Sequence, residues 1–389
     1  MKRFLLTILS ASVLAACGST AGTPASAPIP GSASSAPPLS SVTPTAYADA
    51  PTTTTSPSGP NCEPVIAAMT PRERVAQLLV VGVDPSNPAA AADLVRTQQV
   101  GGIFIGGNPT DLLTNNALAA VQGGAKVRIS VAVDDEGGRV QRIDELDGHM
   151  LSAREMALTM TPAQVRDLAE QRGRALLARG VTVDYAPDVD LTDQAAGAAI
   201  GDRSFSADPA VARQYALAFA EGLAAAGVQP VLKHFPGHGR ASGDSHTGSV
   251  VTPPLAQLRT HDLLPYDKIA EYGNVGVMVG HLEVPELTGG EPASLSPAAY
   301  QLLRNDYGFT GPVVTDDLGA MRAVTDRYPL PEAVVRALKS GADQALWSAG
   351  GAVGPVLDRL EQAVATGELP AARVHEALQR VLLAKRACA

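Results

Sequence analysis

Residues 233–246, with the sequence KHFPGHGRASGDSH, gather side chains that can hold and move protons. They follow the apolar run 228–232, which predicts a short buried strand. The proline and glycines of the stretch then break regular structure, so most of it is expected to form a loop. Lys233 and His234 are predicted to stand where the strand ends. The rest should extend further out, on a loop that its glycines leave free to move.

The spacing of Asp244 and His246 suits acid/base chemistry. A carboxylate two residues from a histidine can pair with the imidazole and favour its protonated form. Such a pair can donate and accept protons near neutral pH. One alternative from the residues alone is a polar surface loop without a function. Another is a metal site built from His234, His238, Asp244 and His246. The proline and glycine between its first two histidines argue against a helical ligand pair.

Eight short apolar runs, rich in β-branched residues, alternate with helical patterns in the body of the chain. The runs are 77–83, 101–106, 128–133, 181–186, 228–232, 275–279, 311–315 and 342–347. Helical patterns lie between them, 255–272 being one, and the patterns 353–366 and 370–386 close the chain. This alternation predicts an α/β protein with a parallel sheet covered by helices. Eight strands indicate a single-domain (β/α)₈ TIM-type barrel, and no G-x-G-x-x-G follows the first strand to support an open dinucleotide-binding sheet.

Polar residues follow most of these predicted strands. In a barrel the carboxyl ends of all strands meet at one rim, where barrel enzymes keep their active sites. The residues expected at this rim are Asp134–Arg142, Asp188, Gly201–Phe205, Lys233, His234, His281, Glu283, Asp316, Asp317 and Trp347. Spacing alone leaves Asp316 and Asp317 equivalent as carboxylates at the seventh strand.

The first sixty residues are predicted to lie outside the fold. Residues 1–16 have two basic residues followed by a short apolar segment and small residues, which is typical of a secretory signal. Residues 14–17, Leu-Ala-Ala-Cys, resemble a bacterial lipobox, which implies that Cys17 becomes the lipidated N-terminus; cleavage as an ordinary secreted protein is the alternative. Residues 17–60 are rich in Ser, Thr, Pro, Ala and Gly, so we expect a disordered tether.

The charge and the cysteines restrict partners and compartment. The chain has a net charge of −9, and residues 61–389 carry −10 because Lys2, Arg3 and Asp49 contribute a net +1. An acidic body argues against nucleic acid as a partner, and it leaves the lipid anchor as the only expected membrane contact. Cys62 and Cys388 lie at the two ends of the folded region, so an oxidising compartment permits a disulfide between them, with two free thiols as the alternative.

Four motifs together resemble those of glycoside hydrolase family 3, in its bacterial β-N-acetylglucosaminidase branch and single-domain lipoprotein form. The motifs are residues 134–142, 201–205, 233–246 and 315–318, and the resemblance covers residues 61–389. It implies a retaining mechanism, with Asp316 as the nucleophile and His246 as the acid/base residue oriented by Asp244. It also implies that the substrate is bound by Asp134, Arg142, Arg203, Lys233 and His234.

The resemblance therefore predicts an exo-acting β-N-acetylglucosaminidase that removes terminal β-GlcNAc from peptidoglycan fragments in the cell envelope. The protein is expected to act as a lipid-anchored monomer on a saccharide or muropeptide, without cofactor or metal. A β-glucosidase or GlcNAc phosphorylase of the same fold, or a non-catalytic lipid-anchored sugar-binding protein, are the alternatives. Two positions depart from the family pattern: Arg240 is expected to touch the leaving group or solvent, and Met321 follows Asp316 at a longer spacing than usual.

Overall fold

The structure is a computed structural model that describes residues 60–351 and 353–388. The signal peptide predicted for residues 1–16, the lipidation site Cys17 and nearly all of the predicted tether lie outside these described residues. No helix in the described ranges is long and apolar enough to cross a membrane.

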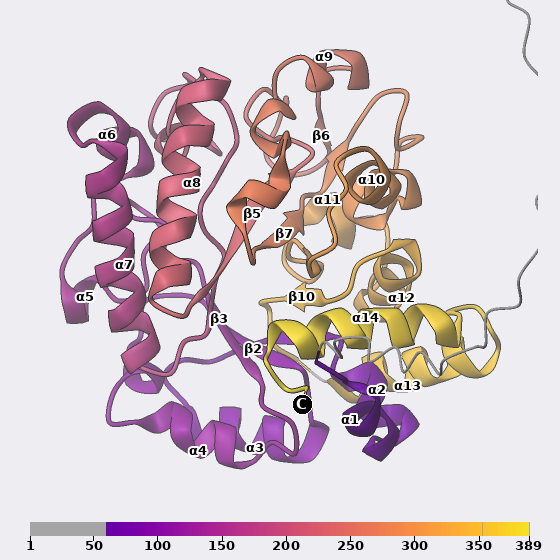
Figure 1. Ribbon diagram of the computed structural model, residues 1–389. Helices are drawn as coiled ribbons and strands as arrows, with labels where there is room; N and C mark the ends of the chain where they lie inside the picture. The colour runs from indigo at the N-terminus through magenta and orange to yellow at the C-terminus, as the bar shows by residue number, and fades with distance from the viewer. Residues whose placement is uncertain (1–59, 352, 389) are drawn as a thin grey trace, which may run out of the picture. The chain divides into compact units, whose positions relative to one another are not determined.

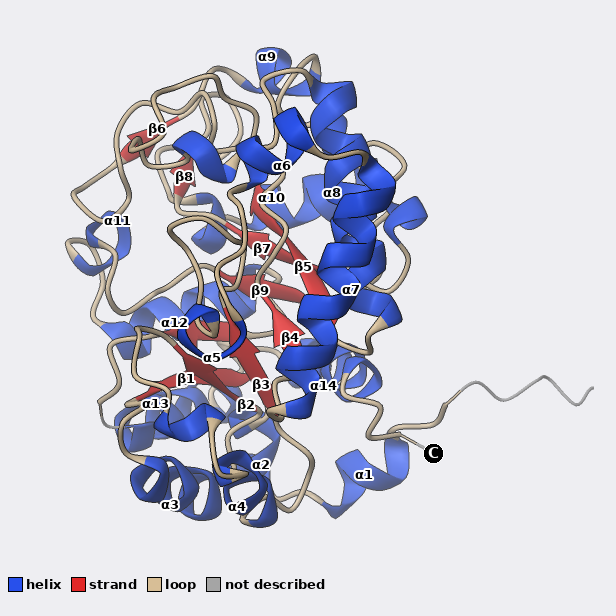
Figure 2. Ribbon diagram, turned by 90° about the vertical axis from the view of Figure 1, so that its left-hand side faces the viewer, coloured by secondary structure: helices blue, strands red, loops and turns tan. Residues whose placement is uncertain are grey.

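The centre of the fold is a closed barrel of eight parallel strands, as predicted (Figures 1 and 2). The strands are β1 (Leu79–Val83), β2 (Gly102–Ile105), β3 (Ser130–Val133), β4 (Val183–Asp184), β5 (Gln229–Phe235), β7 (Gly276–Val279), β9 (Val313–Thr315) and β10 (Ala345–Trp347). From β1 to β9 each strand pairs with the next in this order, and β1 also pairs with β10. A parallel bridge between Val314 and Gln344 joins β9 to β10, which closes the barrel.

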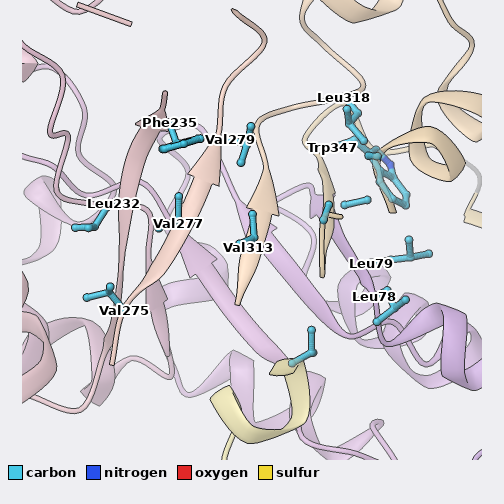
Figure 3. Packing of buried hydrophobic residues seen from close by; sticks show 14 of the residues in the cluster. Leu78, Leu79, Leu232, Phe235, Val275, Val277, Val279, Val313, Leu318 and Trp347 are labelled. Atoms are coloured by element: carbon cyan, nitrogen blue, oxygen red, sulfur yellow. The ribbon is translucent and has the colours of Figure 1, made fainter. Parts of the chain in front are cut away.

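Alternation along the strands divides the apolar side chains between the interior of the barrel and the layer under the helices. The interior set is Val80, Phe104, Ala132, Val183, Tyr185, Val231, Met278, Val314 and Leu346. Their sequence neighbours belong to the much larger core outside the barrel, which includes Val277, Val279 and Val313 (Figure 3). Because both faces of each strand are covered by apolar groups, the strands appear in the sequence as nearly continuous apolar runs.

Helices surround the barrel (Figure 2). They are α1 (Glu63–Ala68), α2 (Pro71–Ala76), α3 (Pro88–Gln98), α4 (Ala117–Gly123), α5 (Asp144–Asp147), α6 (Ala153–Thr159), α7 (Pro162–Ala178), α8 (Pro209–Ala225), α9 (Leu255–Arg259), α10 (Pro297–Gln301), α11 (Arg322–Thr325), α12 (Leu330–Ser340), α13 (Val353–Ala365) and α14 (Ala371–Ala384). Capping residues set several boundaries: the Thr161 side chain accepts a hydrogen bond from Gln164 N–H at the start of α7.

The structure corrects two predicted elements. The helix predicted over 255–272 is broken into α9 and two 3₁₀ turns, Leu264–Tyr266 and Ile269–Tyr272, because Pro265 interrupts it. The fifth strand continues through Lys233 and His234 to Phe235 instead of ending before them. The short strands β6 (Val250–Val251) and β8 (Leu282–Glu283), which pair with each other outside the barrel, were not predicted.

A disulfide joins Cys62, just before α1, to Cys388, beyond α14. The two Cα atoms are 4.6 Å apart although 326 residues separate the cysteines in sequence. The bridge therefore holds the two ends of the described chain together.

Replacing both cysteines, Cys62→Ser with Cys388→Ser, should lower the free energy of unfolding by about 2–5 kcal/mol, because the unfolded chain regains the freedom that a very long closed loop removes. Urea unfolding of the oxidised protein and the double variant measures the difference. Reductant should lower the stability of the parent protein to that of the variant and leave the variant unchanged. Equal urea midpoints for the two oxidised proteins would contradict this expectation.

Candidate active site

The alternation that fills the barrel interior also directs charged groups into its carboxyl-terminal mouth. The residues two positions beyond the inward-facing Ala132, Val231, Val314 and Leu346 are Asp134, Lys233, Asp316 and Ser348. Because side chains alternate with a period of two, these four groups point to the same side as the interior core. All four line one cavity of about 770 Å³.

The same cavity is lined by every residue for which the sequence suggested a role in substrate binding or catalysis. These residues are Asp134, Arg142, Arg203, Lys233, His234, Asp244, His246 and Asp316. They come from the segments after β3 and β4, from β5 and the loop after it, and from the end of β9. Residues far apart in sequence are thus gathered at one end of the barrel.

Glu136 binds two cations of the cavity, Arg203 and Lys233, at the same time. Its carboxylate accepts two hydrogen bonds from Arg203, both at 2.8 Å, and forms an ion pair of 2.5 Å with Lys233. Lys233 also donates to Asp134 at 2.7 Å. Burial alone would raise the pKa of Glu136, but the charges of Arg203 and Lys233 outweigh it and hold that pKa far below its ordinary value. The cluster is therefore charged and preorganised.

His234 is oriented by a buried carboxylate. Its Nδ1 lies 2.7 Å from Asp190 Oδ2, while its Nε2 lies 3.4 Å from the Arg203 guanidinium. Burial lowers the pKa of His234, although the charge of Asp188 opposes that shift. A neutral ring donating through Nδ1 leaves Nε2 as an acceptor facing Arg203 at the cavity.

Among the buried side-chain atoms that have no hydrogen-bond partner within the described chain, Arg142 Nε belongs to a residue that lines the cavity. Buried polar groups are seldom left unpaired, so this part of the site has a donor available for a ligand.

The described residues contain one group that could hold a metal ion, formed by Asp188, Asp190 and His234. It differs from the set considered from the sequence, because of those four residues only His234 belongs to it. The His234 Nδ1 atom is already bonded to Asp190, and Arg203 lies within ion-pair distance of Asp188. The existing partners thus satisfy the group as a hydrogen-bonded cluster.

The two adjacent carboxylates after β9 have different environments. Asp317 accepts hydrogen bonds from the backbone N–H groups of Gly319 and Ala320 and from the Ser348 hydroxyl. Among the described residues, Asp316 accepts a hydrogen bond only from the Asp317 N–H, at 2.8 Å. The Asp317 carboxylate is therefore occupied by hydrogen bonds within its own loop. The Asp316 carboxylate is buried at the cavity and has most of its hydrogen-bonding capacity free.

The pKa of Asp316 lies below its ordinary value. Burial alone would raise it, but the nearby imidazole rings of His281 and His234, the hydrogen bond from Asp317 N–H and the charge of Lys233 together lower it. Asp316 is therefore ionised at neutral pH, as a nucleophile must be.

Asp244 and His246 form the pair that their spacing predicts. His246 Nδ1 lies 2.8 Å from Asp244 Oδ1, which also accepts from the His246 N–H at 3.0 Å. Burial would raise the pKa of Asp244, but its bonds to His246 lower it. Since Nδ1 is engaged, Nε2 is the ring nitrogen left for proton transfer. The His246 side chain is 66% exposed.

Several rim predictions are corrected by the structure. Trp347 is fully buried in the outer core, because it faces the side opposite to Leu346 (Figure 3). Glu283 lies outside the cavity lining and pairs with Arg327. Arg240, expected at the leaving group or in solvent, instead binds the buried carboxylate of Asp262.

Met321 lines the cavity, and its sulfur accepts a hydrogen bond from the Ser245 hydroxyl at 3.3 Å. This contact places the segment after β9 against the loop that carries His246.

Sequence reasoning expected Glu136 and Asp188 at the rim without giving either a role, and it did not name Asp190. A signal was available for Glu136 and Asp190, because each follows another carboxylate at a spacing of two, which keeps both on the same side of an extended chain. Glu136 follows Asp134 in this way, and Asp190 follows Asp188.

A Glu136→Gln variant should lose about 3 kcal/mol of folding free energy, since it leaves two buried cations without their shared carboxylate. It should also raise KM for a sugar substrate, because Lys233 and Arg203 lose their fixed positions. Urea unfolding and steady-state kinetics measure the two effects. The control is Asp93→Asn, which removes one partner of the exposed Asp93–Arg96 pair and should cost less than about 1 kcal/mol. Equal losses in the two variants would be evidence against a central role for Glu136.

Comparisons with known proteins agree with this geometry. The sequence profile described as "Glycosyl hydrolase family 3 N terminal domain" matches residues 70–384. The chain is 48% identical to beta-hexosaminidase LpqI of Mycobacterium tuberculosis over 98% of this chain and 97% of the relative.

Two solved structures superpose well on the fold. One, a glycosyl hydrolase of the GH3 family from Mycobacterium smegmatis, has a TM-score of 0.79 and 52% identity, covering 82% of this chain and 98% of its own. The other, a beta-N-acetylhexosaminidase from Beutenbergia cavernae, has a TM-score of 0.75 and 28% identity, covering 82% and 99%.

Proposed function

The chain belongs to glycoside hydrolase family 3 and is a β-N-acetylhexosaminidase, and we propose that it is a retaining exo-enzyme that removes terminal β-GlcNAc from peptidoglycan fragments. One observation carries the proposal. A buried, ionised carboxylate with a single hydrogen-bond partner, Asp316, lines the same cavity as the Asp244–His246 pair. A nucleophile and a proton carrier facing one cavity are the two groups that retention requires.

In the first step, an Asp316 oxygen attacks the anomeric carbon as the bond to the leaving oxygen breaks. The protonated His246 gives its Nε2 proton to that oxygen, so a glycosyl–Asp316 ester and an alcohol are formed. In the second step, neutral His246 takes a proton from water, which attacks the anomeric carbon and releases Asp316. Two inversions return the sugar with its β configuration.

The charged cluster around Glu136 is proposed to hold the sugar. Asp134, Arg142, Arg203, Lys233 and His234 offer both donors and acceptors for hydroxyl and acetamido groups. Hydrogen bonds that involve a charged partner are about twice as strong as neutral ones, and their fixed geometry favours one orientation. Arg142 Nε, which has no partner within the described residues, adds a donor of the same kind.

The exo mode is supported by the scarcity of aromatic rings in the cavity. Phe104 and Tyr185 are its only aromatic carbocycles within the described residues, and they stack on each other with ring centroids 5.7 Å apart at the barrel interior. A long sugar-stacking cleft would need exposed aromatic faces along its length. A single polar subsite that encloses one terminal residue fits this lining better.

The test uses aryl β-GlcNAc and aryl β-glucoside substrates, each with and without phosphate, with products followed by NMR. We expect faster hydrolysis of the GlcNAc substrate, β-GlcNAc as the first-formed anomer, and no GlcNAc 1-phosphate. An α anomer first would exclude retention, and a sugar phosphate would establish phosphorolysis. Release of GlcNAc from the non-reducing end of a GlcNAc–MurNAc peptide tests the natural substrate class.

The location at the cell envelope is part of the same proposal. Residues 1–17 have the features of a lipoprotein signal ending in Cys17, and the tether would place the enzyme outside the membrane. A Cys17→Ser variant of the full chain should move from the membrane fraction to the soluble fraction of expressing cells. Unchanged membrane association would exclude anchoring through Cys17.

A further inference from the structure

Residues 242–251 form the loop that carries Asp244 and His246, and backbone hydrogen bonds join the two ends of this loop. At the base, the backbones of Ser242 and Val251 exchange two hydrogen bonds, of 2.8 and 3.2 Å. Val250 at this base is fully buried against Ala241 and Leu282. Of the tip residues, Ser245 is buried, whereas His246 and Thr247 are exposed.

Because the tip packs against few groups, its position depends on a small number of hydrogen bonds. All of those that reach the tip and outer flank from outside the loop, among the described residues, come from the segment after Asp316. The Ala323 N–H donates to Ser245 O at 3.1 Å, and the Ser245 hydroxyl contacts the Met321 sulfur. Arg327 donates to the Ser249 hydroxyl at 2.8 Å. Figure 2 shows α11 on the same side of the barrel as β6 and β8.

Arg327 is the group that connects these parts. Besides Ser249, its guanidinium donates to Gly290 O at 2.6 Å and pairs with Glu283 in β8. One side chain thus joins the outer flank of the His246 loop, the strand under the base of that loop, and the chain that leads from Asp316. A guanidinium suits this task because its planar fork can bond several acceptors at fixed angles.

We propose that Arg327 is a positioning residue, which holds the Asp244–His246 loop against the segment after Asp316 so that the proton donor stands at the cavity. The inference rests on the proposed roles of Asp316 and His246. It adds that the acid/base group keeps its place through a contact far from the sugar. General acid catalysis depends on donor placement, and a displacement of 1 Å can cost about 10²-fold in rate.

The discriminating measurement is the dependence of kcat/KM on the leaving group. An Arg327→Ala variant should lose about 10- to 100-fold with a poorly acidic leaving group such as an alkyl alcohol. With 2,4-dinitrophenolate, which leaves without protonation, kcat/KM should stay within about twofold of the parent value, because bond cleavage then needs no acid. Amide hydrogen exchange should also become faster over residues 242–250.

The controls separate positioning from general destabilisation. Arg322→Ala removes a nearby exposed arginine that pairs only with Asp326 among the described residues, and it should leave both substrates unaffected. Arg327→Lys, which keeps a donor, should recover part of the loss with the alkyl substrate. An equal loss with both leaving groups in Arg327→Ala would mean a merely structural role and would overturn the inference.

The proposed role of Arg327 can be wrong while the proposed function is right, and the experiments distinguish the two cases. If His246→Ala depends strongly on the leaving group while Arg327→Ala does not, the acid/base assignment stands and the positioning role is wrong. If His246→Ala itself shows no such dependence, the acid/base assignment is wrong and the role of Arg327 falls with it.

Discussion

An Asp316→Ala variant should lose on the order of 10⁴-fold or more of kcat/KM for an aryl β-N-acetylglucosaminide, as expected when a group that forms a covalent intermediate is removed. That loss corresponds to at least about 5 kcal/mol in the activation free energy. The reason lies in the environment of Asp316. Its carboxylate is buried, has a lowered pKa, and among the described residues accepts a hydrogen bond only from the Asp317 N–H, so it is ionised and largely free to attack.

Azide provides a positive test of this role. In the Asp316→Ala variant the space left by the carboxylate can admit azide, which would attack the anomeric carbon from the face that Asp316 uses. The expected product is the α-glycosyl azide, formed with recovery of rate. A β-glycosyl azide, or no rescue together with a small loss of activity, would place the nucleophile elsewhere.

Asp317→Asn is the matched control, because it changes the adjacent carboxylate while keeping its shape. The Asn side-chain oxygen can still accept from the Gly319 and Ala320 N–H groups, so about one hydrogen bond is weakened. The weakened hydrogen bond costs about 1 kcal/mol, so kcat/KM of this variant should fall by less than about tenfold. Azide should have no effect on this variant. The comparison decides between two carboxylates that spacing alone left equivalent.

The sequence predicted the barrel well because its strands are covered on both faces. Runs such as 275–279 and 311–315 lack the alternation of polar and apolar residues that a strand with one solvent face shows. A strand buried on both faces has this pattern. The helix predicted over 255–272 failed because hydrophobic residues at helical spacing also pack when the chain is broken into short turns. The strands β6 and β8 were missed because two residues each are too short to show a period.

The prediction of the site residues divides in the same physical way. Groups at strand ends, such as Lys233 and Asp316, could be placed because barrel geometry fixes where strand ends point. Arg240 and Glu283 could not, because their partners Asp262 and Arg327 are brought near them only by the folding of separate loops. The role of Glu136 could not be predicted either, because its partners Lys233 and Arg203 come from other parts of the chain. Pairings between loops are thus the part that local pattern does not contain.

The pH dependence of kcat/KM should follow from the same groups. Asp316 must be ionised in the free enzyme, and its pKa is lowered because the nearby imidazole rings, the Asp317 N–H and the charge of Lys233 outweigh the effect of burial. Activity should therefore persist as the pH falls and be lost only below the ordinary pKa of an aspartate, about 3.9.

A His246→Ala variant should lose about 10²- to 10⁴-fold of kcat/KM with an alkyl leaving group, the usual contribution of general acid–base catalysis. With 2,4-dinitrophenolate the loss should be less than about tenfold, since that group leaves without a proton. His375→Ala is the control, because that histidine pairs with Glu63 on the outside of the molecule and should affect neither substrate.

The second half of the reaction gives an independent measure of the same residue. Without His246 no base activates water, so the glycosyl–Asp316 ester formed from the dinitrophenyl substrate should accumulate, with a burst of phenolate and a low kcat. Azide needs no base, and it should raise kcat and give the β-glycosyl azide, opposite in configuration to the product expected from Asp316→Ala. If one imidazole acts in both steps, the His246→Ala variant should form the ester slowly from alkyl substrates and also hydrolyse the ester slowly. Loss of the first step alone would require a second base, and Asp244, which lines the same cavity and loses its partner in this variant, is the carboxylate to test.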